Sequence, residues 1–185
     1  MARLVRHTRL WALDTGVLGY GAIGAGLYGI LGLFLAPLAP LVGLRPAFAL
    51  VPFFGFSFGP IVGFVVGFAG QVISGLISGA TITDSILPGL GSGVAGLVAG
   101  LAPLYLARFT TGSLRRRALG GAIAGIVGSA AGSLVALGGV LGGGALGTIL
   151  WDEVVPLFIG NGLVSLVLVP ILVYAWDPLS ESMAS

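Results

Sequence analysis

Long uncharged, apolar stretches alternate along this chain with short groups of charged residues. The stretches that carry no charge are residues 15–44, 46–83, 85–107, 118–151 and 154–176. Each of them is longer than the ~20 residues that an α-helix needs to cross a bilayer. The pattern therefore predicts an all-α integral membrane protein.

The stretch 46–83 is long enough for either one helix or two. Gly59-Pro60 near its middle favours two, because this pair marks a turn and proline suits the first turn of a new helix. The sequence thus predicts a bundle of six transmembrane helices, at roughly 15–37, 45–57, 59–79, 85–107, 118–141 and 154–176. The second is short and contains Pro52, so a bent, tilted or incomplete span stays open.

The arginines predict the orientation, since cytoplasmic loops of membrane proteins carry an excess of Arg and Lys. Six spans with the N-terminus inside leave only Arg45 outside, whereas five spans divide the arginines less cleanly. We therefore expect a basic cytoplasmic tail at 1–14, a six-helix membrane domain at 15–176 and a cytoplasmic C-terminal tail at 177–185.

Composition agrees with a lipid environment. The 185 residues include only eight Lys and Arg and six Asp and Glu, 57% are hydrophobic, and the mean hydropathy is +1.13. A soluble domain has about a quarter charged residues. All eight basic residues are arginines, in short clusters between apolar stretches, which does not indicate a nucleic-acid-binding face.

Chemistry for catalysis is scarce in this sequence. None of the predicted spans has a charged residue in its interior, where proton relays and carboxylate metal sites would need one. The only histidine, His7, lies in the basic tail, cysteine is absent, and without lysine no GxxxxGK[ST] phosphate loop can form. We therefore predict that the chain is not an enzyme and binds no cofactor or metal.

Small residues recur at four-residue spacing on several predicted helices. Examples are Gly63 and Gly67, Gly96 and Gly100, Gly128 and Gly132, and on the first helix Ala22 with Gly26 and Ala25 with Gly29. Residues four apart share a helix face, and small ones let helices in lipid approach closely. We expect the third to fifth helices to pack within one bundle. The first helix could pack there or dock another membrane protein.

Polar and aromatic groups gather in the half of the bundle that the topology places outside. Gln71 and Asn161 lie in the third and sixth helices, below a rim of Arg45, Asp84, Trp151, Asp152 and Glu153. A few polar anchors among apolar walls are typical of a small-molecule pocket. The alternatives are amides that bond a neighbouring helix and a tryptophan in the interfacial belt.

Four stretches of the sequence carry a resemblance to a known family. They are Gly21-Ala-Ile-Gly-Ala-Gly-Leu-Tyr-Gly29, Leu44-Arg-Pro-Ala47, Phe53-Phe-Gly-Phe-Ser-Phe-Gly-Pro-Ile-Val-Gly-Phe-Val-Val-Gly-Phe68 and, in the last helix, Asn161-Gly162 with Ser165 and Pro170-Ile-Leu172. Together they resemble the substrate-binding (S) subunits of energy-coupling-factor (ECF) vitamin transporters, especially the riboflavin-type subgroup. No single motif is specific; order, spacing and six-span topology carry the resemblance.

The resemblance implies a multi-pass subunit of an ECF-type ABC importer in a prokaryotic cell membrane. Such a subunit captures a vitamin or vitamin precursor from outside and works with a membrane coupling (T) subunit and two ATPase subunits. The family's contact with the coupling subunit maps onto Ala22, Ala25, Gly26 and Gly29. Gln71 stands where relatives more often have asparagine, which leaves open a riboflavin-like or a thiamine-precursor-like heterocycle.

In this interpretation Arg45 closes over the ligand, Trp151 stacks on its ring, and Gln71 and Asn161 bind its polar edge. Asp84, Asp152 or Glu153 accept hydrogen bonds from its donors. The alternative is a membrane structural or assembly protein that holds partners through its glycine-rich faces and binds no ligand. A self-sufficient channel fits less well, because the predicted inner halves lack polar lining.

Overall fold

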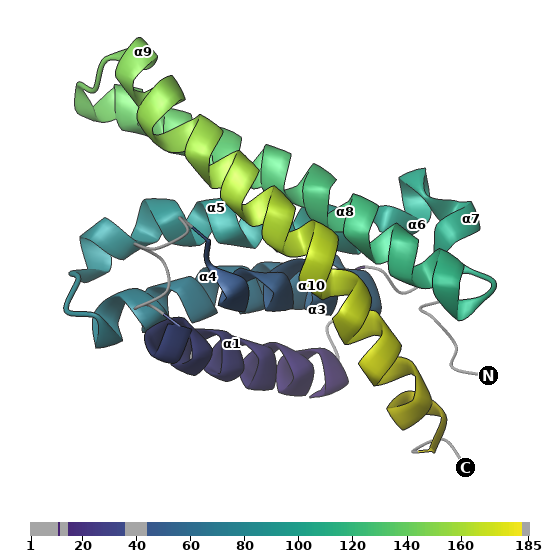
Figure 1. The fold of residues 1–185 in the computed structure, drawn as a ribbon. Helices are drawn as coiled ribbons and strands as arrows, with labels where there is room; N and C mark the ends of the chain where they lie inside the picture. The colour runs from purple at the N-terminus through teal and green to yellow at the C-terminus, as the bar shows by residue number, and fades with distance from the viewer. Residues whose placement is uncertain (1–10, 12–14, 36–43, 183–185) are drawn as a thin grey trace.

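The computed structural model describes residues 11, 15–35 and 44–182, which form helices and no strands (Figure 1). The elements, in order, are α1 (Thr15–Leu35), η3 (Pro46–Ala49), α3 (Leu50–Phe58), α4 (Pro60–Ile77), α5 (Ile82–Gly100), α6 (Ala102–Tyr105), α7 (Ala107–Thr110), α8 (Leu114–Leu134), η4 (Val135–Gly142), α9 (Leu146–Ile149), η5 (Leu150–Val154) and α10 (Val155–Ser182). The predicted all-α class is confirmed. Apart from Trp11, the predicted N-terminal tail lies outside the described residues.

Five helices are long and apolar enough to cross a membrane, which supports a multi-pass membrane protein. They cover Thr15–Leu33, Pro60–Ile77, Ile82–Gly100, Leu114–Gly142 and Leu146–Asp177. The second predicted span, 45–57, is shorter than the other five: η3 and α3 together cover only Pro46–Phe58. Those 13 residues rise by about 20 Å, against about 30 Å of hydrocarbon. Among the apolar segments that the structure describes, this one therefore covers only part of the thickness of a membrane.

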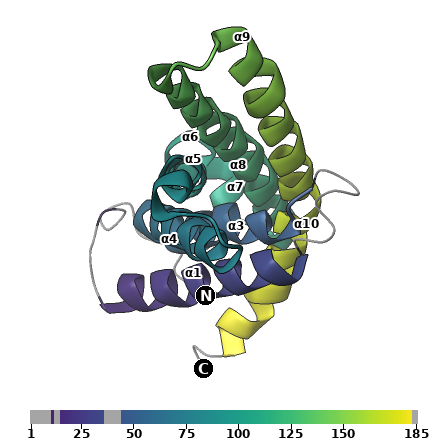
Figure 2. The ribbon, with the colours of Figure 1, turned by 90° about the vertical axis from the view of Figure 1, so that its left-hand side faces the viewer.

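The short helix α3 lies at the centre of the bundle. It contacts α1, α4, α5, α8 and α10, and every residue from Leu50 to Phe56 is buried. Figure 2 shows α1 and α4 on one side of it and α8 and α10 on the other. A helix that is apolar on all sides lies away from water, either in a protein core or in a membrane, and α3 is buried among its neighbours. α3 therefore forms the core on which the five longer helices pack.

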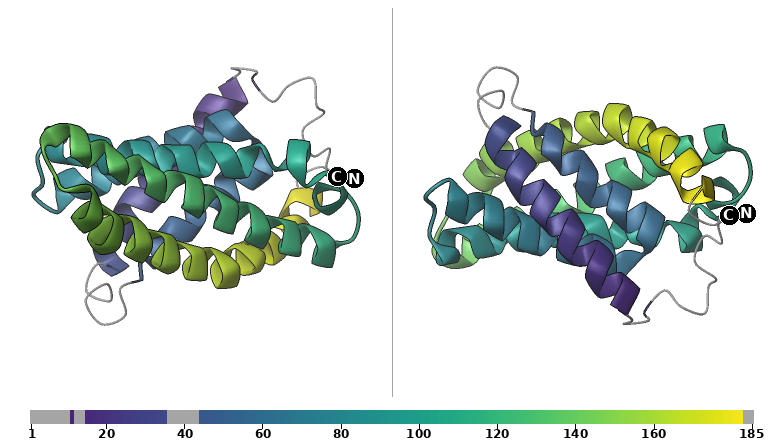
Figure 3. Two further views of the ribbon diagram at one scale, coloured as in Figure 1. Left: turned by 90° about the horizontal axis from the view of Figure 1, so that it is seen from above. Right: turned by 90° about the horizontal axis from the view of Figure 1, so that it is seen from below.

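Contacting residues give the relative directions of the helices. In α4 and α5, Gly63 meets Gly96 and Gly67 meets Ser92, so these helices are antiparallel. The same reading gives α1 parallel to α4, and α8 antiparallel to both α5 and α10. Gly59, with φ of 108°, makes the reversal between α3 and α4. Six apolar segments thus alternate in direction along the chain (Figure 3).

The glycine faces act as close-packing surfaces inside the bundle, as predicted for the third to fifth helices. A Cβ atom at Gly96 would collide with the backbone carbonyl of Gly63, and one at Gly128 would collide with the carbonyl of Ala95. Because these carbonyls belong to neighbouring helix backbones, no side-chain rotation can relieve the collision. Small residues therefore set the spacing between α4, α5 and α8.

Two predicted helix boundaries are wrong. The fourth predicted helix, 85–107, ends at Gly100 and is followed by the short helices α6 and α7, because Pro103 cannot donate a backbone hydrogen bond to the preceding turn. The fifth begins at Leu114 instead of 118 and includes Arg115 to Arg117. The prediction places these charges in a loop, whereas arginine is a good helix former and here begins the helix.

The last helical run is longer than the prediction. It extends from Leu146 through a π-helical turn, η5, and continues in α10 to Ser182, so residues 177–182 of the predicted tail are helical. The part from Leu146 to Asp177 has 32 residues and a rise of about 48 Å, which exceeds the thickness of the hydrocarbon core. Its ends therefore reach polar surroundings, where Asp152, Glu153 and Asp177 lie.

Candidate functional site

Three neighbouring cavities open at one end of the bundle, and Arg45 lines all of them. Their volumes are about 190, 270 and 320 Å³. They lie between the turn that joins α4 to α5 and the start of the last helical run, and we call this part of the molecule the cavity end. Known pockets for small molecules have volumes of roughly 300–1,000 Å³. The third cavity, of about 320 Å³, reaches the lower end of that range.

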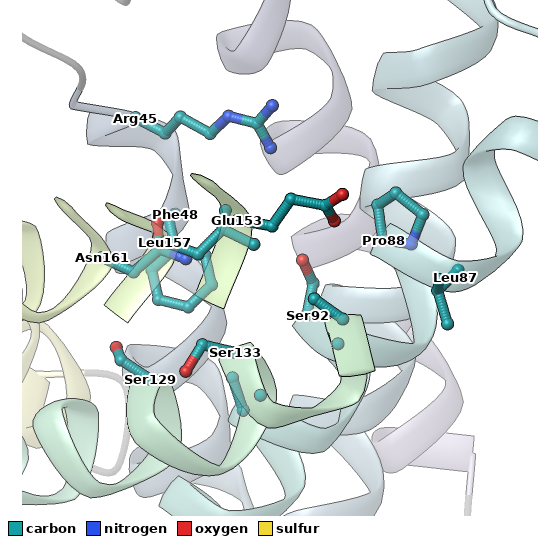
Figure 4. A pocket seen from close by; sticks show the side chains of 14 residues that line it. Arg45, Phe48, Leu87, Pro88, Ser92, Ser129, Ser133, Glu153, Leu157 and Asn161 are labelled. Atoms are coloured by element: carbon teal, nitrogen blue, oxygen red, sulfur yellow. The ribbon is translucent and has the colours of Figure 1, made fainter. Parts of the chain in front are cut away.

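The first cavity lies between α5, α8 and the start of α10 (Figure 4). Its mouth holds the guanidinium of Arg45 and the carboxylate of Glu153, which face the same space without forming an ion pair with each other. Below them the lining includes the ring of Phe48 and the hydroxyls of Ser92, Ser129 and Ser133. The cavity thus offers an unpaired cation and anion above a mixed apolar and hydroxyl surface.

The second cavity lies beside the first, on the α10 side. It shares Arg45, Glu153 and Asn161 with the first cavity and adds Asp152. Asp152 and Glu153 belong to the π-helical turn η5, and Asn161 lies two turns further along α10. Single π-helical turns widen a helix locally and are frequent at functional sites. Here the turn brings both carboxylates to the same opening as Arg45.

The third cavity lies on the opposite side of Arg45, between α1, α4 and α5. Its lining includes Gln71, and the Tyr28 hydroxyl donates a hydrogen bond of 2.7 Å to the Gln71 side-chain oxygen. Tyr28 is buried, with 3% of its surface exposed. The hydrogen bond satisfies the Gln71 oxygen and holds the amide at the cavity wall. Gln71 therefore forms the hydrogen bond to a neighbouring helix that the sequence analysis gives as the alternative to ligand binding.

Asp84 also lines the third cavity, but it has a structural role there. The Thr81 hydroxyl donates to the Asp84 carboxylate at 2.6 Å and accepts from the Asp84 backbone amide at 3.2 Å. Thr81 is the N-cap residue of α5, and its hydroxyl oxygen satisfies a backbone amide in the first turn of the helix. One carboxylate oxygen is thus engaged at the helix start, and the side chain remains exposed beside the cavity.

Trp151 differs from the other predicted site residues. It is 69% exposed and lines none of these three cavities, so in this conformation it cannot stack on a ligand within them. The aromatic ring that faces the first cavity is Phe48, which is only 2% exposed. Phe48 lies in the short 3-10 helix η3, which begins at Pro46, directly after Arg45, and leads into α3. The exposed position of Trp151 suits an interfacial residue.

Several residues of the cavity lining were not predicted from the sequence, although their spacing carries a signal. Ser85 and Ser92 are seven residues apart on α5, and Ser129 and Ser133 are four apart on α8. Both spacings place a pair of hydroxyls on one helix face. Ser85 lines the third cavity and the other three line the first. Serines at these spacings, facing glycine-rich neighbours, would have indicated the lining.

The small residues of α1 divide between two faces. Ala25 is buried, and a Cβ atom at Gly29 would meet Ile73 of α4, so this pair packs inside the bundle. Ala22 is exposed, and nothing lies within 4 Å of a Cβ atom built at Gly26. The sequence did not separate the two pairs. Of the four residues predicted to contact a coupling subunit, only Ala22 and Gly26 are accessible to one.

No known family model matches the chain, and no solved structure shows significant similarity to it. The chemistry of the site therefore rests on its own residues. The lining of the three cavities includes one guanidinium fork, three carboxylates, two amides, six serines and the phenyl ring of Phe48. In the described part of the chain, no three metal-ligating side chains come together. The arrangement offers hydrogen-bond donors and acceptors of both charges beside apolar walls.

Proposed function

We propose that this protein is the substrate-binding subunit of an ECF-type vitamin importer. It would capture a vitamin or vitamin precursor at the cavity end and deliver it through a separate coupling subunit and two ATPase subunits. The observation that carries the proposal is the convergence of three cavities on Arg45. Six of the seven residues predicted for the site line these cavities: Arg45, Gln71, Asp84, Asp152, Glu153 and Asn161.

The proposal includes the topology. The six alternating segments return the chain to the end from which α1 started, which supports six passages and two cytoplasmic termini. The short α3 would be the second passage, shielded from lipid by its neighbours. The cavity end would then face outward, and the end with Arg115 and Arg116 would face the cytoplasm, as the excess of arginine there favours.

Each group at the cavity end has a role in this proposal. Arg45 would bind oxygens of the ligand through its guanidinium fork, and Glu153 would accept from ligand N–H or O–H groups. Asn161 can both donate and accept, which suits the edge of a heterocycle. Phe48 replaces Trp151 as the ring that would stack on the ligand, because it faces the cavity.

The coupling subunit would dock on the outward face of α1. Ala22 and Gly26 are one helical turn apart, and Gly26 has open space beside it. In lipid, such a face allows the close approach of a second helix. Ala25 and Gly29 would support this face from inside the bundle and would not touch the partner.

The decisive experiment is mass spectrometry of small molecules released from gently purified protein, followed by titration with riboflavin and thiamine. We expect a stoichiometric heterocycle, and binding weakened by Asn161→Leu because the ligand edge loses its partner. Leu163→Ala, on the lipid-exposed side of the same helix, is the matched control. A protein without ligand after growth in vitamin-supplemented medium, and without affinity for either probe, would refute the proposal.

The second candidate is a membrane assembly protein that binds partners and no small molecule. The exposed Ala22–Gly26 face favours it as much as it favours an importer subunit. The two functions differ in their dependence on the cavity end. A partner that co-purifies equally with the parent protein and with a double Arg45→Gln, Asn161→Leu variant, in the absence of any ligand, would support assembly.

A further inference from the structure

The end of the bundle opposite the cavities carries a group of exposed arginines. Arg108 lies on α7, and Arg115 and Arg116 lie in the first turn of α8. Phe109 packs directly against Gly120, which holds α7 beside the start of α8. Between the two helices, Gly112 has a φ of 113° and its Cα region lies next to the Arg116 side chain. Three exposed arginines thus lie on two neighbouring helices joined by one turn, and we call them the arginine cluster.

The arginine cluster lacks negative partners in the structure. Arg117, the next residue, pairs with Asp177 of α10. Among the side chains that the structure describes, no carboxylate forms an ion pair with Arg108, Arg115 or Arg116. Positive charge in the first turn of a helix is also unfavourable, because the helix macrodipole is positive at that end. The three guanidinium groups are therefore available to an anion from outside the described chain.

Apolar side chains lie next to the arginine cluster on the same helices. Leu119 is one turn after Arg115, on the same face of α8, and is 50% exposed. Leu104 and Tyr105 precede Arg108 on α6 and are 62% and 42% exposed. A ligand bound here would meet positive charge first and hydrocarbon directly beneath it. This order matches a phospholipid, with its phosphate at the arginines and its acyl chains along the leucines.

The geometry points to a binding site for an anionic phospholipid at the arginine cluster, Arg108, Arg115 and Arg116. The headgroup phosphate accepts hydrogen bonds from the guanidinium groups, which suit phosphate in a forked geometry. The acyl chains lie against Leu104 and Leu119. This site is independent of the ligand proposed for the cavity end. It would fix the level of α7 and of the start of α8 at one membrane surface.

The test is native mass spectrometry of the full-length protein in detergent, titrated with phosphatidylglycerol or with phosphatidylcholine of the same acyl chains. Each arginine near an anionic headgroup contributes about 1 kcal/mol, or about a fivefold change in affinity. We expect phosphatidylglycerol to bind more tightly than phosphatidylcholine, and Arg115→Gln with Arg116→Gln to lower its affinity about 25-fold. Arg115→Lys with Arg116→Lys, which keeps the charge, should retain most of the affinity.

Two controls make the result decisive. Thr148→Glu, at an exposed position on α9 at the other end, lowers the net charge without touching the cluster. If Thr148→Glu weakens phosphatidylglycerol binding as much as a single Arg115→Gln does, the overall charge of the protein explains the binding and the proposed site is overturned. Inorganic phosphate is added in the second control. If millimolar phosphate displaces the lipid, the cluster binds a soluble anion and the phospholipid assignment is overturned. Unchanged melting temperatures show that the variants are folded.

Discussion

The Tyr28 hydroxyl donates a hydrogen bond of 2.7 Å to the side-chain oxygen of Gln71, which joins α1 to α4 at the wall of the third cavity. The two residues are 43 positions apart. Tyr28 lies on the buried side of α1, next to Gly29, whereas Ala22 and Gly26 look outward. One helix therefore both completes the cavity wall and presents the face proposed for a partner.

Removal of this hydrogen bond should weaken the bundle modestly. Tyr28→Phe leaves the Gln71 oxygen without its donor, and we expect the free energy of unfolding to fall by about 1 kcal/mol. Thermal unfolding in detergent measures the change. Tyr20→Phe is the matched control, since the Tyr20 ring stacks on Phe58 and its hydroxyl forms no hydrogen bond with the described residues. Equal effects of the two substitutions would contradict the role assigned to the bond.

Glycine substitutions should separate packing positions from open ones. Gly96→Val places a branched side chain against the Gly63 carbonyl, where only a shift of α4 from α5 can make room. Overpacking of this kind costs about 3 kcal/mol. Gly19→Ala meets nothing within 4 Å and should stabilise α1 by about 0.5–1 kcal/mol, since alanine is the better helix former. A stable, unaltered Gly96→Val protein would overturn the close approach of α4 and α5.

The ion pair between Arg117 and Asp177 should hold the start of α8 to the end of α10. The two side chains are 14% and 16% exposed. The Nε atom of Arg117 is buried and has no hydrogen-bond acceptor among the described residues. The pair therefore lies between the surface case, worth about 1 kcal/mol at most, and the fully buried case. We expect Asp177→Asn to cost about 2 kcal/mol in unfolding experiments.

The double exchange Arg117→Asp with Asp177→Arg tests this pair directly. If the two charges interact, the exchanged protein should recover part of the stability that each single substitution removes. Arg115→Gln, on the exposed side of the same turn, should change stability by less than about 0.5 kcal/mol. If the effects of the two single substitutions simply add in the double variant, the interaction between Arg117 and Asp177 contributes nothing to stability.

The sequence predicts the helical class and most helix positions. Both depend on average hydropathy and charge over a window as long as one span, and the sequence gives these averages directly. It misplaces boundaries where a local feature outweighs that average, as at Pro103 and at Arg115 to Arg117. The central position of α3 also could not be predicted. Its apolar residues suit lipid and protein surroundings equally well, so only the packed structure distinguishes the two.

The sequence directs attention to residues whose polarity is exceptional in an apolar chain. Arg45 and Asn161 stand out in their segments, and both line the cavities. It gives no such signal where the side chain is ordinary for a membrane protein. Phenylalanine and serine are common in this chain, so the sequence does not single out Phe48 and Ser92. Only the packed structure shows that they face a cavity. Trp151 was chosen for its chemistry, but the orientation of a single ring depends on the local helix geometry at η5.

Ligand binding should depend on Phe48 more than on Trp151. Phe48 faces the first cavity and is 2% exposed, so Phe48→Leu removes a ring that can stack on a heterocycle while it keeps an apolar side chain of similar size. Stacking contributes about 0.5–1.5 kcal/mol, which corresponds to a roughly twofold to tenfold loss of affinity. Trp151→Leu should change the affinity less than twofold, because its ring lies outside the three cavities.

Titration of each variant with the heterocycle released from the parent protein gives both values. A large loss for Trp151→Leu with none for Phe48→Leu would show instead that η5 folds over the opening when the ligand binds, because only such a movement brings Trp151 to the ligand.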